Sequence, residues 1–437
     1  MKNIHEIRDP IHVFIKYDSD ERRVINSRPL QRLRHIHQLA LTFLLYPGAT
    51  HRRFEHSLGV MELSDRIFQI LTHDDNLKDQ TKKQFPELSQ KDYWRRVLRM
   101  AALCHDIGHL PFSHAAEKEL LPEGWTHEKL TRDIILSQEM KEIWEDVTPP
   151  LRAIDIAKLA IGPDKAPDLD FTNWETVLSE IIVGDAFGAD RIDYLLRDSH
   201  HLGVAYGKFD HYRLIDTMRI LPASKLGEDD ESEEQFLGIK KGGLQSAEAL
   251  SLARYFMYSQ VYLHSVRRIY DIHLRDFLTE WLDNGKFSTD IERHLSITDS
   301  EVTSSLRKAA KYSSKIGHEF ANRIMNRKHF KVLYERNPAD YDINTEAASL
   351  IKKSAEEKFG KNRIRLDSYA QKSGFINFPV LQRDGIFASG VSMSSILAQL
   401  PAVAIDYLFV DSDIIKEAKK WLHKNKRDII KPYGEEE

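Results

Sequence analysis

An apolar stripe at helical spacing runs directly into an adjacent histidine and aspartate. The stripe consists of Trp94, Val97, Leu98 and Ala101, at the i, i+3, i+4 and i+7 positions of one buried helix face. The next turn carries His105 beside Asp106, and a carboxylate at the end of a buried face is costly unless it is paired or metal-bound. Gly108 and Pro111 would then interrupt the helix and let neighbouring side chains converge on one ion. The segment predicts a metal site at the end of a core helix or, if the pair is isolated, a satisfied core histidine beside an aspartate.

The first two thirds of the chain carry mostly helical patterns after a short extended start. Residues 8–27 place two apolar stretches on either side of the turn-like segment DSD at 18–20, which predicts a short β-hairpin. Helical periodicity then dominates, with long patterns over residues 175–196 and 244–282. These patterns predict a mainly α fold, with residues 1–284 as a helical core domain that begins with the hairpin.

The last third of the chain has a mixed character. Polar, lysine-rich helical segments beyond about residue 285 precede aromatic and branched stretches at 375–381 and 402–411, which are typical of strands. Ser412 is a candidate cap for a final basic helix that runs through Arg427. We therefore expect residues 285–437 to form a smaller C-terminal α+β lobe.

Composition narrows the chemistry and the cellular setting. The 63 basic and 67 acidic residues leave a formal charge of -4, which argues against an obligate polyanion-coating protein. Cys104 is the only cysteine, so a bound metal must use imidazole and carboxylate ligands. The sequence contains no apolar run long enough to span a bilayer, and its start, MKNIHEIRDP, lacks the apolar centre of a secretory signal. We therefore expect a cytoplasmic protein.

Two further motifs flank the histidine-aspartate pair in order along the chain. His56 lies in RFEHSLG at 53–59, and Asp190 lies in ADRIDY at 189–194. This ordered pattern resembles the HD superfamily of metal phosphohydrolases. The stretches DPIH at 9–12, QRLR at 31–34, PGA at 47–49 and PFSH at 111–114 narrow the resemblance to deoxynucleoside triphosphohydrolases, and among them to the SAM and HD domain-containing triphosphohydrolases. The resemblance covers roughly residues 5–275 and includes no SAM domain.

The resemblance implies a helical HD-domain core that holds one or two divalent metal ions. The implied ligands are His56, His105, Asp106 and Asp190. A divalent ion on such ligands lowers the pKa of a bound water and polarises a phosphorus centre. Mn, Fe, Zn and Mg all suit nitrogen and carboxylate ligands, so the ligand chemistry leaves the ion open.

The resemblance also implies a group of catalytic residues beside the phosphates. These are His109, His114, Glu117 and His127. We expect His114 to act as general acid or base, with Glu117 and His127 orienting it, because a histidine can move a proton near neutral pH. Surface or core histidines are the alternative interpretation of these positions.

The expected substrate contacts come from four parts of the chain. They are Gln38, Leu39, Arg53, Arg191, Tyr194, Asp198, Arg254 and Tyr262. The arginines suit phosphate oxygens, and Arg191 stands where the family has a lysine. Asp198 matches a carboxylate for the sugar 3'-hydroxyl, with Gln38 and Leu39 beside the deoxyribose. Tyr262 would stack on the base, and its eight-residue spacing from Arg254 suits one helix face.

The family's activator sites bind nucleotides between subunits, and this chain matches them only in part. Gln31, Arg34 and His264 agree with the family pattern, whereas Arg8, Asn26 and Ser265 replace an asparagine, a carboxylate and a lysine. We therefore expect a homo-oligomer, a dimer or tetramer, in which a nucleotide activator is possible but guanosine triphosphate is not assured.

Three functions are compatible with these residues. The leading one is hydrolysis of a deoxynucleoside triphosphate at the α-phosphate, giving a deoxynucleoside and tripolyphosphate. A second keeps the metal chemistry but acts on another nucleotide or a nucleic-acid end. A third is a nucleotide sensor that binds without turnover, which the intact ligand set argues against. The lysine-rich segment 308–361 would favour nucleic acid only if its charge gathered on one face.

Overall fold

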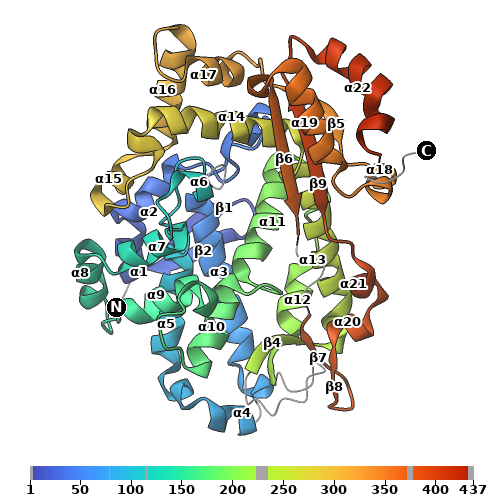
Figure 1. Cartoon of the computed structure of the whole chain (residues 1–437). Coiled ribbons are helices and arrows are strands. Elements are labelled where there is room, and N and C mark those ends of the chain that lie inside the picture. Colours follow the sequence, from blue (N-terminus) through green and yellow to red (C-terminus); the bar gives the residue numbers. More distant parts are fainter. Residues whose placement is uncertain (1–2, 78, 114–116, 223–234, 372–376, 432–437) are drawn as a thin grey trace. The chain divides into compact units, whose positions relative to one another are not determined.

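The structure of the chain is a computed structural model that describes residues 3–77, 79–113, 117–222, 235–371 and 377–431 (Figure 1). Its residues form two compact units. Unit 1 contains residues 1–257, 287–302 and 375–400, and unit 2 contains residues 258–286, 303–374 and 401–437. The division of the chain into a domain of residues 1–284 and a lobe of residues 285–437 stays a prediction.

Unit 1 is built mainly from helices, as the sequence predicts. Helix α3 is central, because it packs against α5, α10 and α11, and α5 also packs against α9. The helices of unit 1 are α1 (Ser19–Ile25), α2 (Arg28–Arg32), α3 (Arg53–Leu71), α4 (Asp79–Gln84), α5 (Lys91–Cys104), α6 (Glu117–Leu120), α7 (His127–Ile135), α8 (Gln138–Asp146), α9 (Ala153–Ile161), α10 (Asn173–Val183), α11 (Ala189–Leu202), α12 (His211–Thr217), α13 (Leu244–Met257), α15 (Ile291–Ser296), α20 (Gly390–Met393) and α21 (Ser395–Gln399). The expected mainly α fold is confirmed.

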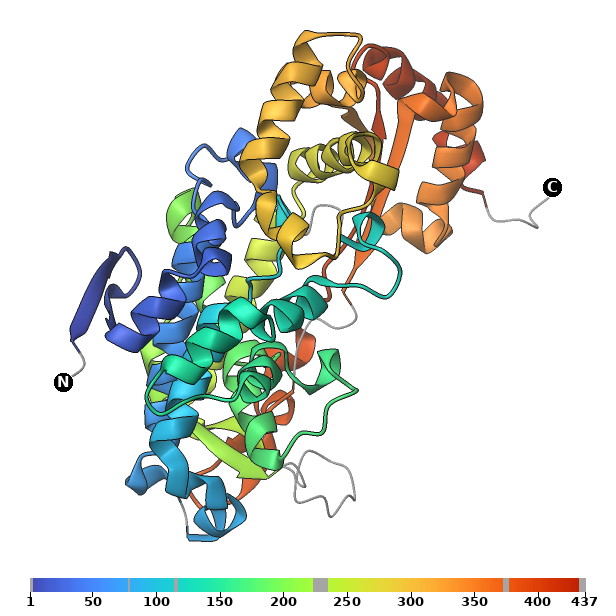
Figure 2. The ribbon, with the colours of Figure 1, turned by 90° about the vertical axis from the view of Figure 1, so that its left-hand side faces the viewer.

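The N-terminal hairpin is present, but it begins and ends earlier than predicted. Strands β1 (Ile4–Asp9) and β2 (Val13–Asp18) pair antiparallel beside α1 (Figure 2). The segment at 18–20 is a helix start rather than a turn, because Asp18 accepts hydrogen bonds from the amides of Asp20 and Glu21 while the Glu21 carboxylate accepts from the Asp18 amide. The apolar pair at 24–25 therefore lies in α1, not in a second strand.

The long helical pattern at 175–196 is interrupted at two glycines. Helix α10 ends before Gly184 and α11 begins after Gly188. A Cβ atom on Gly184 would lie 2.3 Å from the carbonyl oxygen of Glu180, and one on Gly188 would lie 2.6 Å from the carbonyl oxygen of Gly184. The backbone is so closely packed at both glycines that a side chain has no room, and the helical pattern of residues 175–196 therefore covers two helices, α10 and α11.

A four-stranded sheet completes unit 1. Its strand order is β3 (Met218–Pro222), β4 (Gln235–Lys240), β7 (Pro379–Leu381) and β8 (Phe387–Ser389). The β4 and β7 strands are parallel, and the other neighbouring pairs are antiparallel. Of the strand predicted at 375–381, residues 379–381 therefore pair within unit 1, and residues 375–376 lie outside the described residues.

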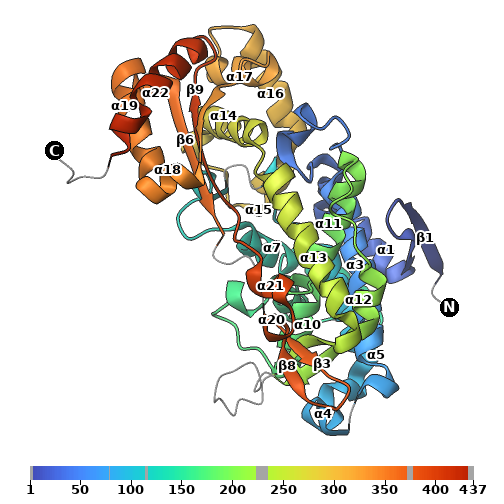
Figure 3. The same cartoon turned by 90° about the vertical axis from the view of Figure 1, so that its right-hand side faces the viewer.

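Unit 2 contains a three-stranded antiparallel sheet with helices on both faces (Figure 3). The strand order is β5 (Lys331–Glu335), β9 (Ala404–Val410) and β6 (Ile364–Ala370). Along β9, Leu408 and Val410 face α19 and α22, whereas Tyr407 and Phe409 face α14. The helices of unit 2 are α14 (Ser265–Trp281), α17 (His318–Met325), α18 (Pro338–Ile343), α19 (Ala347–Phe359) and α22 (Ile415–Ile429), while α16 (Asp299–Lys311) has residues in both units.

The final helix starts later than predicted. Helix α22 begins at Ile415, and its N-cap residue is Ile414, which makes no side-chain capping hydrogen bond. Ser412 is therefore not the cap. The basic character of the helix is as expected, with Lys426 and Arg427 in its last turn.

Candidate metal centre

Three of the four expected metal ligands converge in unit 1. His56 lies on α3, His105 is the C-cap of α5, and Asp190 lies in the first turn of α11. One ligand atom of each lies within 4.8 Å of the others. His56 Nε2 is 3.0 Å from Asp190 Oδ1, and His105 Nε2 is 3.6 Å from the same oxygen. Three separate helices therefore bring two imidazoles and a carboxylate to one point.

The donor set fits a divalent cation. His105 Nδ1 hydrogen bonds to the carbonyl oxygen of Ala102 at 2.7 Å, which makes Nε2 the nitrogen with the lone pair. That buried Nε2 has no hydrogen-bond partner within the described residues. A buried imidazole nitrogen that faces carboxylate oxygens without a hydrogen bond is the arrangement expected of a metal ligand. These residues could hold one divalent ion.

Asp106 lies beside His56 and His105 and also contacts Arg53 and His109. Its oxygens are 3.4 Å from His105 Nε2 and 3.7 Å from His56 Nε2. The carboxylate accepts a hydrogen bond from the buried Arg53 guanidinium and lies 3.1 Å from His109 Nε2. Burial raises the pKa of Asp106, but Arg53 and the two neighbouring histidines outweigh it and hold the pKa well below the usual value. Asp106 is therefore an ionised group between the expected metal ligands and the basic side chains.

Asp193 holds His56 from behind and was missed by sequence reasoning. Asp193 Oδ2 is 2.8 Å from His56 Nδ1, and Asp193 Oδ1 is 2.7 Å from His12 Nε2. Arg197 donates to both oxygens of Asp193 and to Asp9, and Asp193 and Arg197 have no exposed surface. The carboxylate fixes the tautomer and the orientation of His56 so that Nε2 faces Asp190. The available signal was spacing, because Asp193 follows Asp190 by one helical turn.

The acidic groups around His56 keep it protonated while no metal is bound. Burial lowers its pKa, but hydrogen bonds and charges from Asp190 and Asp193 outweigh that effect and raise the pKa to about 10. Burial raises the pKa of Asp190, but the hydrogen bond from His56 and the charges of His56 and His105 outweigh it and hold the pKa below the ordinary value. A metal ion must therefore displace a proton from His56.

A second cluster of ionisable side chains lies in the same unit. His109, Glu117 and His127 also place one ligand atom each within 4.8 Å of the others. The rings of His109 and His127 stack with centroids 3.9 Å apart, and His127 Nδ1 lies 2.8 Å from Glu117 Oε1. Burial and the charge of Arg53 lower the pKa of His109 well below its usual value, so its imidazole is neutral. His114 lies outside the described residues.

Gly108 explains how these loops come together. A Cβ atom at Gly108 would lie 2.2 Å from the carbonyl oxygen of His127 and 2.3 Å from the amide nitrogen of Thr131. The Gly108 amide donates to Thr131 Oγ1 at 3.0 Å. The glycine thus lets the segment after α5 touch the first turn of α7, which brings His109 against His127.

A strained loop follows His109 and is held by Asp299. Phe112 and Ser113 have φ angles of 55° and 52°, a conformation that costs energy in residues with side chains. The Phe112 amide donates to Asp299 Oδ1 at 2.7 Å, and the amide and Nδ1 of His37 lie 2.8 and 2.6 Å from Asp299 Oδ2. Ser113 Oγ accepts a hydrogen bond from Arg53 Nε at 2.7 Å. Sequence reasoning missed Asp299, because nothing in its local sequence links it to a loop so distant along the chain.

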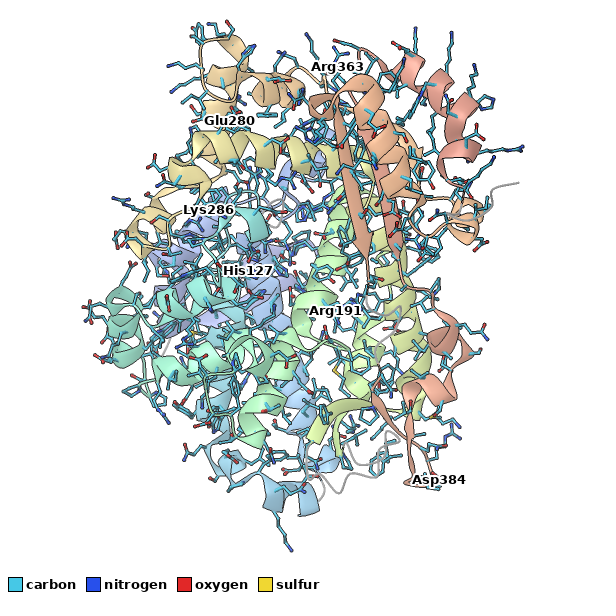
Figure 4. The ribbon with its side chains drawn as sticks, viewed as in Figure 1. His127, Arg191, Glu280, Lys286, Arg363 and Asp384 are labelled. Carbon is cyan, nitrogen blue, oxygen red and sulfur yellow. The ribbon has the colours of Figure 1, made fainter. Side chains whose placement is uncertain are left out.

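The arginines near the metal ligands are placed differently from one another. Arg53 is buried and bonded to Asp106 and Ser113. Arg191, labelled with His127 in Figure 4, donates from Nη2 to Asp185 at 3.0 Å. Its Nε and Nη1 are buried without a hydrogen-bond partner in the described part of the chain, which suits an anionic ligand. Tyr194 interacts with Arg191 on the same face of α11.

The residues expected around the sugar lie near each other in unit 1. Asp198 is on α11, and its Oδ1 is 2.7 Å from Nε2 of His51, a residue that sequence reasoning missed. The Gln38 amide donates to the carbonyl oxygen of His51 at 3.1 Å. Gln38 Oε1 is a buried acceptor that has no hydrogen-bond partner among the described residues, and Leu39 is buried beside it in sequence.

Arg254 and Tyr262 lie in different helical segments. Helix α13 ends at Met257, so Arg254 is in its last turn. Tyr262 ends a π-helical turn, Tyr258–Tyr262, that belongs to unit 2. The two residues are therefore not part of one α-helix, and their shared face stays a prediction.

Two family models match the chain. One, described as HD domain, matches residues 53–162, and the other, described as HD associated region, matches residues 209–363. The first match contains His56, His105 and Asp106, and Asp190 falls between the two matches. Within the described residues, no helix combines the length and the apolar character needed to cross a membrane.

Relatives and a solved structure agree with these matches. The uncharacterized protein MJ1154 of Methanocaldococcus jannaschii is 34% identical over 306 residues, which cover 70% of this chain and 56% of that protein. The deoxynucleoside triphosphate triphosphohydrolase SAMHD1 of Bos taurus is 30% identical over 291 residues, covering 62% of this chain and 46% of that protein. The chain spans about half the length of these curated relatives. The crystal structure of a hypothetical protein from Aquifex aeolicus has a TM-score of 0.77 and 33% identity, and the match covers 96% of this chain and 100% of that one.

Proposed function

The chain belongs to the HD superfamily, and from this membership we propose that it is a metal-dependent deoxynucleoside triphosphate triphosphohydrolase. The observation that carries the proposal is the convergence of His56, His105 and Asp190, with a buried His105 nitrogen that makes no hydrogen bond within the described residues. The similarity to SAMHD1 supports a nucleotide substrate. We further propose that Asp106 is the fourth ligand.

In the proposed reaction, water adds to the α-phosphorus and the bond from that phosphorus to the 5'-oxygen breaks. The 5'-oxygen takes a proton, and the products are a deoxynucleoside and tripolyphosphate. When bound, the divalent ion supplies a Lewis acid and lowers the pKa of a coordinated water. The remaining requirements are cations that hold the triphosphate and a group that moves a proton.

The chain's own basic groups would hold the triphosphate. Arg191 has two buried donors without acceptors within the described residues, and Arg53 is already desolvated beside Asp106. A guanidinium in such surroundings binds phosphate oxygens with little reorganisation. Arg254 is proposed to contact the same triphosphate.

Proton movement is assigned to the histidines that follow α5. His109 is neutral at pH 7, so it can accept a hydrogen bond or a proton from water. Glu117 orients His127 through its 2.8 Å contact, and His127 stacks on His109. His114 stays the proposed general acid or base. Sugar contacts are proposed for Gln38, Leu39 and Asp198, a hydrogen bond to substrate for Tyr194, and base stacking for Tyr262.

The test is direct product analysis. Purified protein is incubated with each of the four deoxynucleoside triphosphates and with Mn, Fe, Zn or Mg, and nucleosides and phosphates are separated by chromatography. We expect deoxynucleoside and tripolyphosphate, with loss of at least about 100-fold in rate for Asp106→Ala, as for removal of a metal ligand. His73→Ala, at an exposed histidine outside the site, is the matched control.

Three outcomes would contradict the proposal. Release of single phosphate or pyrophosphate would assign another nucleotide hydrolase. Unchanged turnover in the folded Asp106→Ala protein would remove Asp106 from the site. Binding of nucleotide without any product would favour a sensor. A homo-oligomeric state, a nucleotide activator and a cytoplasmic location stay predictions.

A further inference from the structure

His51 connects two parts of unit 1 that the proposed function places around the sugar. It lies just before α3, and its side chain is fully buried. Its Nε2 is 2.7 Å from Asp198 Oδ1, and Asp198 is buried as well. Because Nε2 faces a carboxylate oxygen at this distance, it donates the proton of the hydrogen bond. One oxygen of Asp198 is therefore tied, and the rotation of the carboxylate is restricted.

The ring of His51 is held on its flat side by a second histidine. The rings of His51 and His201 are stacked with centroids 4.4 Å apart and an interplanar angle of 12°. His51 Nδ1 is buried and has no hydrogen-bond partner in the described part of the chain. The orientation of the ring thus depends on Asp198 at one edge and on His201 at one face.

The backbone of His51 is tied to the other proposed sugar residue. Its carbonyl oxygen accepts the amide hydrogen of Gln38 at 3.1 Å, and the adjacent residues His37 and Arg52 form an isolated β-bridge. The loop lies so close to α11 that a Cβ atom on Gly48 would be 2.2 Å from the carbonyl oxygen of His201. The loop therefore has little room to move relative to Asp198.

We propose that His51 is a positioning residue that orients the Asp198 carboxylate toward the 3'-hydroxyl of the substrate sugar and so sets a preference for nucleotides that carry this hydroxyl. The inference rests on the proposed function. His51 acts through Asp198, because its Nε2 is bonded to that carboxylate, and through the backbone of Gln38, whose amide donates to the His51 carbonyl oxygen. A buried polar pair with one defined geometry is preorganised, and preorganisation matters most for a contact formed in the transition state.

The experiment compares two substrates that differ only at the sugar. Rates and KM are measured with a deoxynucleoside triphosphate and with the 2',3'-dideoxynucleoside triphosphate of the same base. For His51→Ala we expect kcat/KM to fall about tenfold or more with the deoxy substrate, as for one charged hydrogen bond, and to stay within about twofold with the dideoxy substrate. The preference between the two substrates should therefore collapse.

Further variants keep the test decisive. If His51→Ala does not fold, His51→Asn takes its place, because asparagine keeps a polar side chain but is too short to reach Asp198. His51→Asn should then show the loss of preference that we expect of His51→Ala. His51→Gln can still donate a hydrogen bond and should recover part of the preference. Asp198→Asn should lose the same preference, and combining it with His51→Asn should cause no further loss. His73→Ala again serves as the surface control.

The outcomes separate this inference from the proposed function. If the wild-type protein releases no tripolyphosphate from any deoxynucleotide, the proposed function is wrong. If it does, but His51→Ala lowers kcat/KM equally for both substrates, His51 has a purely structural role and the inference is wrong. A wild-type protein that does not distinguish the two substrates would also overturn the inference.

Discussion

Gly59 is the position where a single methyl group should disturb the metal centre most. It lies on α3, one turn after His56, and is itself buried. A Cβ atom there would lie 2.0 Å from Asp193 Oδ1 and 2.4 Å from Arg197 Nη2. Normal contact is about 3.5 Å, so one partner would have to move by roughly 1.5 Å. Asp193 cannot move this far without losing its bonds to His12, His56 and Arg197.

Two effects of Gly59→Ala have opposite signs, and their magnitudes decide the outcome. Alanine is favoured over glycine inside a helix by about 1 kcal/mol. Breaking a buried ion pair so that one partner is left uncompensated costs about 3–5 kcal/mol. We therefore expect the free energy of unfolding to fall by about 2–4 kcal/mol, the difference between these two estimates. Because Asp193 orients His56, the affinity for Mn²⁺ should fall about 10- to 100-fold.

The assay is urea unfolding followed by circular dichroism, together with Mn²⁺ titration by calorimetry. Gly203→Ala is the matched control, since Gly203 ends α11 with a φ of 71° and a Cβ atom added to it would meet no atom within 4 Å. Gly203→Ala should lower the free energy of unfolding by about 1–2 kcal/mol through backbone strain and leave the affinity for Mn²⁺ unchanged. A Gly59→Ala protein with wild-type stability, or with unchanged Mn²⁺ affinity, would refute this reasoning.

Two more predictions concern the loop after His109 and the protonation of His56. Asp299→Asn weakens the acceptor of the Phe112 amide, so kcat should fall at least about tenfold while the affinity for Mn²⁺ is unchanged. Kinetics and calorimetry measure the two quantities, and an equal loss of both would contradict a positioning role for Asp299. Because the pKa of His56 is raised to about 10, Mn²⁺ must displace its proton, and affinity should rise by about tenfold per pH unit between pH 6.5 and 8.5. The raised pKa of His56 also stabilises the metal-free fold, fully below pH 6.5 and less as the pH rises toward 10. Urea midpoints of the metal-free protein that increase between pH 6.5 and 10 would contradict a protonated His56.

Structural features that depend on a single short segment could be predicted from the sequence. The apolar stripe before His105 correctly predicted a buried helix that ends at this residue, and the mainly helical fold followed from the same periodicity. The errors at 18–20 and at Ser412 came from local capping, where Asp18 starts a helix and Ile414, not a serine, precedes the last one. In the second case the N-cap has no polar side chain, so a search for capping residues could not have found it.

Residues that act through distant partners could not be predicted in the same way. Asp299 bonds to Phe112 and His37, and His51 bonds to Asp198, across long stretches of chain whose meeting depends on the whole fold. Asp193 is intermediate, since its helical spacing from Asp190 was visible but its hydrogen bond to His56 was not. Local sequence therefore indicated His105 and Asp106, and the family resemblance implied the full set of proposed ligands, whereas their supports required the tertiary structure.

The buried bonds from Arg197 to Asp9 and Asp193 also bear on how the protein reaches its native state. They join the end of β1 to α11, and through Asp193 to His56, so His56 is fully held only after segments from both ends of a long stretch of chain have met. Contacts between residues so far apart in sequence form slowly, because the chain must lose the entropy of closing a long loop before the contacts can stabilise it. In a refolding experiment we therefore expect full metal affinity to appear only after the hairpin has docked on α11.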